Sequence, residues 1–208
     1  METEDNSGLW LSIGDLMSGV MFTFALMFVS VLAQLHTMQE KTMSRRAALT
    51  AALMAELEKN DLEVEAGVDG EIIFKESMLF AQSSANLSES GEGLLAQFAP
   101  IYADVIFSNP DFDQEIARII LEGHTSVEGS EFDNLSLSLR RAESVTLGLL
   151  SEDIEWRAAD HSNQLRTRLY PAGRGEWDAN TEVEATDRRV VLRLQFRGEH
   201  FIEALGGA

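Results

Sequence analysis

The sequence of 208 residues contains no cysteine, and no lysine or arginine occurs before Lys41. The absence of cysteine excludes disulfides and thiolate–metal sites, which is compatible with either side of a membrane. The N-terminal flank is acidic where a cleavable signal peptide requires a basic segment, so we do not expect such a peptide. The formal net charge of −19 argues against nucleic acid or anionic lipid as the partner of the soluble part.

An uncharged apolar run extends from Leu16 to Leu35 and is long enough to cross a bilayer, which requires about 20 residues. We therefore interpret residues 1–36 as a short tail followed by a retained transmembrane helix. Asp15 stands at the head of this run and is expected to lie inside the membrane, where an acidic side chain usually lines an ion path. The alternative is an interfacial N-cap hydrated by lipid headgroups.

Small and polar residues follow one stripe of this predicted helix, mostly at steps of three or four residues. The stripe comprises Ser12, Asp15, Ser18, Gly19, Phe22, Thr23, Ser30 and Ala33. Small residues allow a second helix to approach closely, and a polar stripe should not face lipid alone. We therefore expect partner helices, and a simple tether is the alternative. The residues expected at the helix interface or pore are Ser12, Ser18, Gly19, Phe22 and Thr23.

Residues 37–61 contain strong helix formers without proline or glycine, and they predict a helical stalk. Leu49, Leu53 and Leu57 share one face of this stalk, which we expect to pair with a second copy of the chain. The basic residues Lys41, Arg45 and Arg46 also follow the apolar run, and the positive-inside rule would place the C-terminal domain in the cytoplasm. That rule is strongest for short loops, and large domains are exported regardless of charge.

Residues 62–208 alternate between strand-like and helix-like patterns, which predicts an α+β domain with a sheet layered by helices. A hairpin is expected over residues 62–74, because the Asp69-Gly70 step lies between alternating segments. The other expected elements are helices at 88–107 and 133–150 and strands at 116–122, 164–170 and 189–196. The residues expected to be buried on the second helix are Leu135, Leu139, Ala142, Val145 and Leu149.

Ordered motifs in this part of the chain resemble those of the OmpA-like peptidoglycan-binding domain, whose core has the order βαβαββ. The central motif is Glu122-Gly123-His124-Thr125-Ser126-Val127-Glu128-Gly129-Ser130, followed by Asn134 and by Leu137-Ser138-Leu139-Arg140-Arg141-Ala142. Phe80 and residues 84–87 match upstream, and residues 173–176 and 187–190 match downstream. The resemblance covers roughly residues 63–196. It implies a peptidoglycan-binding role for Thr125, Ser126, Asn134, Leu137, Ser138 and Arg141.

In that family the arginine that matches Arg141 holds the diaminopimelate of the peptide stem, and a guanidinium can clamp a carboxylate with two hydrogen bonds. The alternative is a structural arginine that ties its helix to the preceding loop. The acid that the family places nearby is Ser126 here, which puts the identity of the ligand in question, and Glu128 or Asp133 could supply the missing charge. We expect His124 to be a buried hydrogen-bonding residue of the loop rather than a ligand or a base.

The sequence shows no nucleophile–base pair and no metal-ligand cluster that stands out, so we expect neither an enzyme nor a resident cofactor. One N-terminal span with an early acid, followed by an OmpA-like domain, resembles the MotB class of stator subunits. Within that class it is most similar to the MotB-like subunits of anti-phage defence. The resemblance implies two copies inside a ring of MotA-like subunits in the bacterial inner membrane, anchored to peptidoglycan, with Asp15 carrying H⁺ or Na⁺.

The resemblance also implies a cytoplasmic N-terminus and a periplasmic C-terminal domain. We prefer this orientation to the one that the basic residues favour, because a wall-binding fold has no use in the cytoplasm. Two alternatives share part of the evidence. One is a flagellar stator subunit with the same ion chemistry, and the other is a passive peptidoglycan-binding anchor without ion flux.

Overall fold

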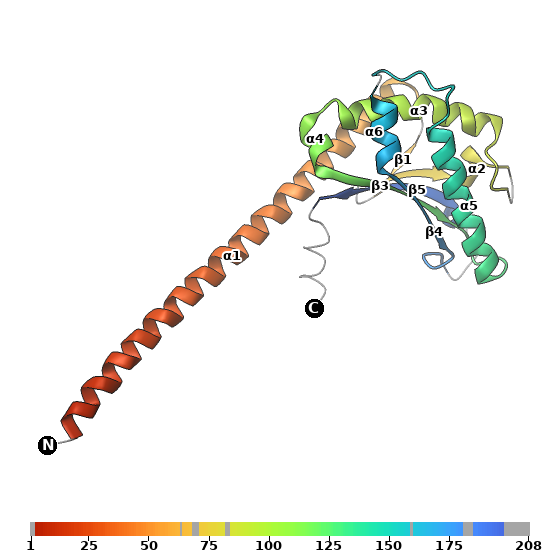
Figure 1. Ribbon diagram of the computed structural model, residues 1–208. Helices are drawn as coiled ribbons and strands as arrows, with labels where there is room; N and C mark the ends of the chain where they lie inside the picture. The colour runs from red at the N-terminus through yellow and green to blue at the C-terminus, as the bar shows by residue number, and fades with distance from the viewer. Residues whose placement is uncertain are drawn as a thin grey trace. The chain divides into compact units, whose positions relative to one another are not determined.

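The computed structural model describes residues 3–62, 64–67, 71–81, 84–158, 160–180 and 185–197 (Figure 1). Contacts divide the chain into two compact units, Met1–Arg45 and Arg46–Ala208. The predicted boundaries at residues 36 and 61, which separate the membrane helix, the stalk and the C-terminal domain, stay predictions. The elements in chain order are α1 Thr3–Lys59, β1 Glu65–Ala66, β2 Ile72–Lys75, α2 Glu76–Leu79, α3 Glu89–Phe107, α4 Pro110–Glu115, β3 Ile116–His124, α5 Glu131–Leu149, α6 His161–Arg168, β4 Leu169–Gly175, the 3₁₀ turn η1 Ala185–Asp187 and β5 Arg189–Phe196.

The helix α1 contains the one stretch, among the described residues, that is long and apolar enough to cross a membrane. Its large apolar side chains between Trp10 and Leu32 are exposed in the isolated chain, and exposure of that extent indicates a membrane or a protein partner. The hydroxyl groups of Ser18 and Thr23 donate to the carbonyl oxygens of Gly14 and Gly19, at 2.8 and 2.9 Å. These polar groups are therefore satisfied within the helix, as a lipid environment requires.

The last turns of α1 correct the predicted stalk interface. Leu49, Leu53 and Leu57 are at most 1% exposed, and all three belong to the core of the unit that begins at Arg46. They are therefore not available to pair with a second copy of the chain. The apolar face is buried, as expected, but the core residues that cover it belong to the same chain and not to a second copy.

The domain is built on a five-stranded sheet with the order β1-β2-β5-β3-β4, in which only the β3–β4 pair is parallel. The helices α3, α5 and α6 lie over one face of this sheet (Figure 1). The pairing of β1 with β2 confirms the predicted hairpin, whose turn at residues 68–70 lies outside the described residues. From β2 onward the principal elements follow the order βαβαββ, which confirms the predicted fold class.

The predicted helices and strands form, but the short elements α2, α4, α6 and η1 were not predicted, and the strand expected at 164–170 is displaced to Leu169–Gly175. The helix α3 begins after its N-cap Ser88, and β5 has the predicted bounds. The short helix α4 was not predicted; it begins because Asn109 caps it and Pro110 occupies its first turn. Residues 164–168, expected to begin a strand, belong instead to α6, and the strand begins only at Leu169. A helix forms there instead of a strand because Leu165 and His161, four positions apart, are both buried on one helical face.

The first half of α5 packs on the ends of β3 and β4, and this position corrects two predicted core residues. Leu139 is 46% exposed and Leu135 is only half-buried, whereas Asn134, Ser138 and Arg141 are buried. The helix approaches β3 closely here, since a Cβ atom at Gly123 would lie 2.1 Å from the carbonyl oxygen of Ser138. Glycine at this position therefore allows the polar face of α5 to pack directly on the strand end.

Candidate functional site

A groove with a volume of about 390 Å³ opens where the loop after β3 meets α2 and the first half of α5. The residues that line it are Glu76, Ser77, Phe80, Thr125, Ser126, Glu128, Asn134, Leu137, Arg141 and Arg188. Two arginines and two glutamates give the groove charges of both signs. Such a site is suited to a ligand that carries both an anionic and a cationic group.

The loop that forms one wall of the groove is held by specific backbone features. Gly129 has a φ of 102°, a conformation that favours glycine, and Ser130 caps α5 by accepting a hydrogen bond from the Asp133 amide at 3.1 Å. The Thr125 amide donates to the carbonyl oxygen of Gly175, at 2.9 Å. The Thr125 hydroxyl is buried and has no hydrogen-bond partner in the described part of the chain.

Arg141 lies at the base of the groove with only 2% of its surface exposed. Its Nε donates to the carbonyl oxygen of Ser84 at 3.0 Å, its Nη2 pairs with Oε1 of Glu76, and its guanidinium lies 5.3 Å from the centre of the Phe80 ring. Burial lowers the pKa of Arg141, and the Glu76 carboxylate opposes that shift. Arg141 therefore serves the structure and borders the groove at the same time.

Glu76 connects two arginines across the groove. Its Oε2 lies 2.8 Å from Nε of Arg188, while its Oε1 pairs with Arg141. Arg188 in turn places Nη1 3.3 Å from Oε2 of Glu128, a residue on the exposed rim. The Glu76 side chain is 14% exposed, so it is accessible from the groove but held in one orientation by both neighbours.

The structure brings together most of the residues predicted for ligand binding. Thr125, Ser126, Asn134, Leu137 and Arg141 all line the groove. Ser138 does not: it is fully buried, and its hydroxyl accepts a hydrogen bond from the Gly175 amide at 3.0 Å. It positions β4 against α5. The role of the five lining residues in binding stays a prediction.

Of the two acids expected to replace the charge missing at Ser126, only Glu128 borders the groove. Asp133 instead accepts a hydrogen bond from its own helix cap, since the Ser130 hydroxyl lies 2.7 Å from its carboxylate. Neither Glu76 nor Arg188 was among the residues expected to bind a ligand. Arg188 lies in the 187–190 segment that carries the family resemblance, but Glu76 had no such signal.

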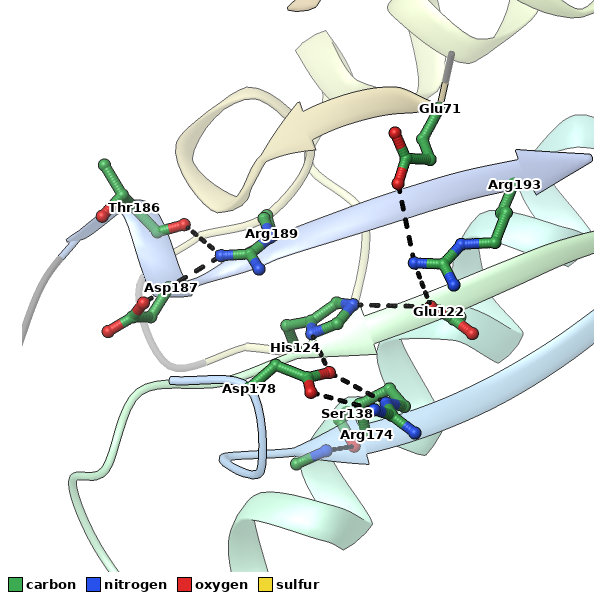
Figure 2. A network of polar contacts seen from close by, with 11 residues as sticks. Glu71, Glu122, His124, Ser138, Arg174, Asp178, Thr186, Asp187, Arg189 and Arg193 are labelled. Carbon is green, nitrogen blue, oxygen red and sulfur yellow. Dashed lines mark hydrogen bonds and ion pairs between the residues drawn. The ribbon is translucent and has the colours of Figure 1, made fainter. Parts of the chain in front are cut away.

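His124 lies in a polar network at the opposite side of the loop (Figure 2). Its Nδ1 is 3.6 Å from Asp178 and its Nε2 is 3.9 Å from Glu122. Burial, followed by the nearby charge of Arg189, lowers the pKa of His124 to about 4, so the ring is neutral at pH 7. The prediction that His124 is buried is confirmed. Both contacts are longer than ordinary hydrogen bonds, and its Nε2 has no hydrogen-bond partner among the described residues.

The second candidate site lies on α1. Asp15 is in the interior of α1, which begins at Thr3, so it does not form the N-cap of this helix. The side chains of Ser12, Ser18, Phe22 and Thr23 are exposed, like that of Asp15. At Gly19 an added Cβ would meet no atom within 4 Å. The stripe is therefore open to a partner helix in the isolated chain.

One membrane-type helix followed by an α+β domain is the arrangement that the resemblance to MotB-like proteins implies. No family model matches the chain. The solved structure of a MotB-like protein from Desulfovibrio vulgaris superposes with a TM-score of 0.56 and 22% identity, covering 78% of this chain and 98% of that one. At this identity the likeness establishes the fold.

Two curated relatives make the resemblance more specific. The Zorya protein ZorB of Escherichia coli O139:H28 is 28% identical over 207 residues, which covers 94% of this chain and 83% of that protein. The Zorya protein ZorB of Escherichia coli strain Crooks is 28% identical over 157 residues, which covers 65% of each. The chain thus resembles ZorB proteins over most of its length and shares the fold of a MotB-like protein.

Proposed function

We propose that this chain is an ion-conducting, peptidoglycan-anchored stator subunit of a MotA/MotB-like motor in the bacterial inner membrane, and that the motor serves anti-phage defence. The observation that carries the proposal is the joint presence, in one chain, of an acid inside a membrane-type helix and a charged groove in an OmpA-type domain. The similarity to ZorB supports the defence role rather than flagellar rotation.

Asp15 is the ion carrier in this proposal. A carboxylate inside a bilayer is costly while it is charged, and binding of H⁺ or Na⁺ removes that cost. The ring of MotA-like (ZorA-type) subunits surrounds the helix, and loading and unloading of Asp15 bias the ring between its conformations. The open stripe around Gly19 and Thr23 supports close approach of such partner helices, including α1 of a second copy.

The OmpA-type domain is the fixed anchor. It lies in the periplasm and binds peptidoglycan through the groove, so that the dimer stays still while the ring turns. The arginines at the groove support binding of a carboxylate. The groove and the network around His124 support no catalytic step, and we propose an anchor rather than an enzyme.

The proposal is tested by expressing the chain together with a MotA-like (ZorA-type) protein and purifying both from membranes. We expect a stable complex with this chain as the minor component, and we expect the full chain in detergent to sediment with purified peptidoglycan. Sedimentation without any MotA-like complex would leave only a passive anchor. A complex without sedimentation would remove the wall anchor from the proposal.

A further inference from the structure

The groove contains the carboxylate of Glu76, a residue outside the motifs that carry the family resemblance. Glu76 is the first residue of α2 and lies between Arg141 and Arg188, with one carboxylate oxygen toward each. Its own amide donates to the carbonyl oxygen of Arg188 at 3.0 Å. Glu76 is thus fixed at both its backbone and its side chain, and it needs no rearrangement to meet a ligand.

Ser126 lines the same groove but provides no charge. It is 3% exposed, and a hydroxyl group alone is a weak partner for a cationic ligand group. The other acid at the groove, Glu128, is 64% exposed on its side chain and lies at the rim. Solvent weakens an ionic contact at such a position, so the half-enclosed Glu76 is the stronger acceptor.

We propose that Glu76 is the specificity-determining carboxylate of this groove and receives the ammonium group of the ligand, the charge contact that Ser126 cannot make. An ionised carboxylate has about four lone-pair sites, and the two arginines occupy one on each oxygen. The remaining sites are available to a cation. The arginines meanwhile provide donors for a carboxylate on the same ligand.

The ligand class that follows is zwitterionic: an amino-acid group with a free ammonium beside a free carboxylate. A purely anionic ligand gains little, because Glu76 and Glu128 already balance the charges of Arg141 and Arg188. This inference rests on the proposed peptidoglycan anchor and names the residue and the ligand group that give it specificity.

The first experiment compares Glu76→Gln with the matched control Glu143→Gln, which removes the same charge from an exposed position of α5 outside the groove. The full chain in detergent is sedimented with purified peptidoglycan. We expect Glu76→Gln to weaken binding by about tenfold or more and Glu143→Gln to change it by less than about threefold, given the usual strength of charged and exposed contacts. Tighter binding by Glu76→Gln would show that Glu76 only blocks Arg141, and unchanged binding would also overturn the inference.

A second variant guards against a folding defect in Glu76→Gln. The double variant Glu76→Gln with Ser126→Asp moves the carboxylate to the position where the resembling family has it. We expect this double variant to recover most of the lost binding. Failure to recover binding, in a protein that unfolds at the same temperature as wild type, would contradict the role of a ligand-facing charge.

The third arm uses the wild-type chain and changes the ligand. Peptidoglycan whose free amines have been acetylated keeps its carboxylates and loses its ammonium groups. We expect wild-type sedimentation to fall by about tenfold or more with this material. Equal binding to native and acetylated peptidoglycan would overturn the inference and leave the anchor intact, whereas no binding to either would remove the anchor itself.

Discussion

Glu76 and Arg141 are 65 positions apart in the sequence and form an ion pair at the base of the groove. The pair joins the segment after β2 to the middle of α5. Because Arg141 is buried, it is both a structural residue and a candidate ligand contact. The two readings that the sequence left open for Arg141 are therefore compatible.

Substitution of Arg141 separates its structural role from its role in binding, because stability and affinity are measured independently. In Arg141→Ala the ion pair and the contact with the Ser84 carbonyl are lost, so we expect the free energy of unfolding to fall by about 1–3 kcal/mol. Affinity for peptidoglycan should fall about tenfold or more at a temperature where the variant is folded. Arg140→Ala, an exposed neighbour on the same helix, is the control and should bind like wild type. A destabilised Arg141→Ala that still sediments normally would assign Arg141 to structure alone.

The contact between β3 and α5 gives a prediction on stability. In Gly123→Ala the new methyl group meets the Ser138 carbonyl, a backbone atom that cannot move away without shifting α5. We expect a loss of about 1–3 kcal/mol in the free energy of unfolding. Gly93→Ala is the matched control, because a Cβ there meets no atom within 4 Å and lies inside α3. It should gain about 0.5–1 kcal/mol. Urea titration of both variants measures the difference, and equal stabilities would show that α5 does not approach the strand so closely.

The buried ring of His124 predicts a dependence of stability on pH. Its pKa is lowered from 6.5 to about 4 in the folded protein, so between these values the unfolded chain binds a proton that the folded chain does not. Stability contributed by the neutral ring is complete above pH 6.5 and is lost as the pH falls toward 4. Relative to His124→Gln, we expect wild type to lose up to about 3 kcal/mol over that window. Parallel pH profiles for the two proteins would show that the folded ring takes up the proton as readily as the unfolded one.

A reporter fusion measures on which side of the membrane the C-terminal domain lies. Alkaline phosphatase is active only after export, and we expect a fusion after Ala208 to be active. The basic residues Lys41, Arg45 and Arg46 argue for the opposite result. An inactive fusion, together with fluorescence from a cytoplasmic reporter at the same position, would exclude a periplasmic wall anchor.

The sequence predicted those parts of the fold that depend on local patterns. The alternation in β5 and the capped, amphipathic α3 are local signals, and both elements formed where expected. The stretch from 164 to 168 was assigned to a strand because nothing local indicates that Leu165 is anchored in the core from a short helix. Likewise, the apolar face at Leu53 shows that something covers it, but periodicity cannot tell a second copy from the chain's own domain.

The same limit applies to the groove. Its loop and the arginine of α5 lie within one continuous motif, so their residues could be predicted together. Glu76 enters the groove only because β2 pairs with β5 and carries α2 beside Arg188. That proximity results from the sheet topology and leaves no mark on the spacing of residues along the chain.

Asp15→Asn tests the central claim, an ion cycle at Asp15, most directly. Asparagine matches aspartate in size and keeps hydrogen-bonding capacity, so assembly with the MotA-like ring should survive. It cannot alternate between a charged and a neutral form, so ion flux must stop, while Asp15→Glu should keep part of the activity. The measurement is phage protection together with ion flux in vesicles, with the complex purified from the same cells to verify assembly. The account predicts an assembled but inactive complex for Asp15→Asn; protection and flux at the wild-type level would contradict it.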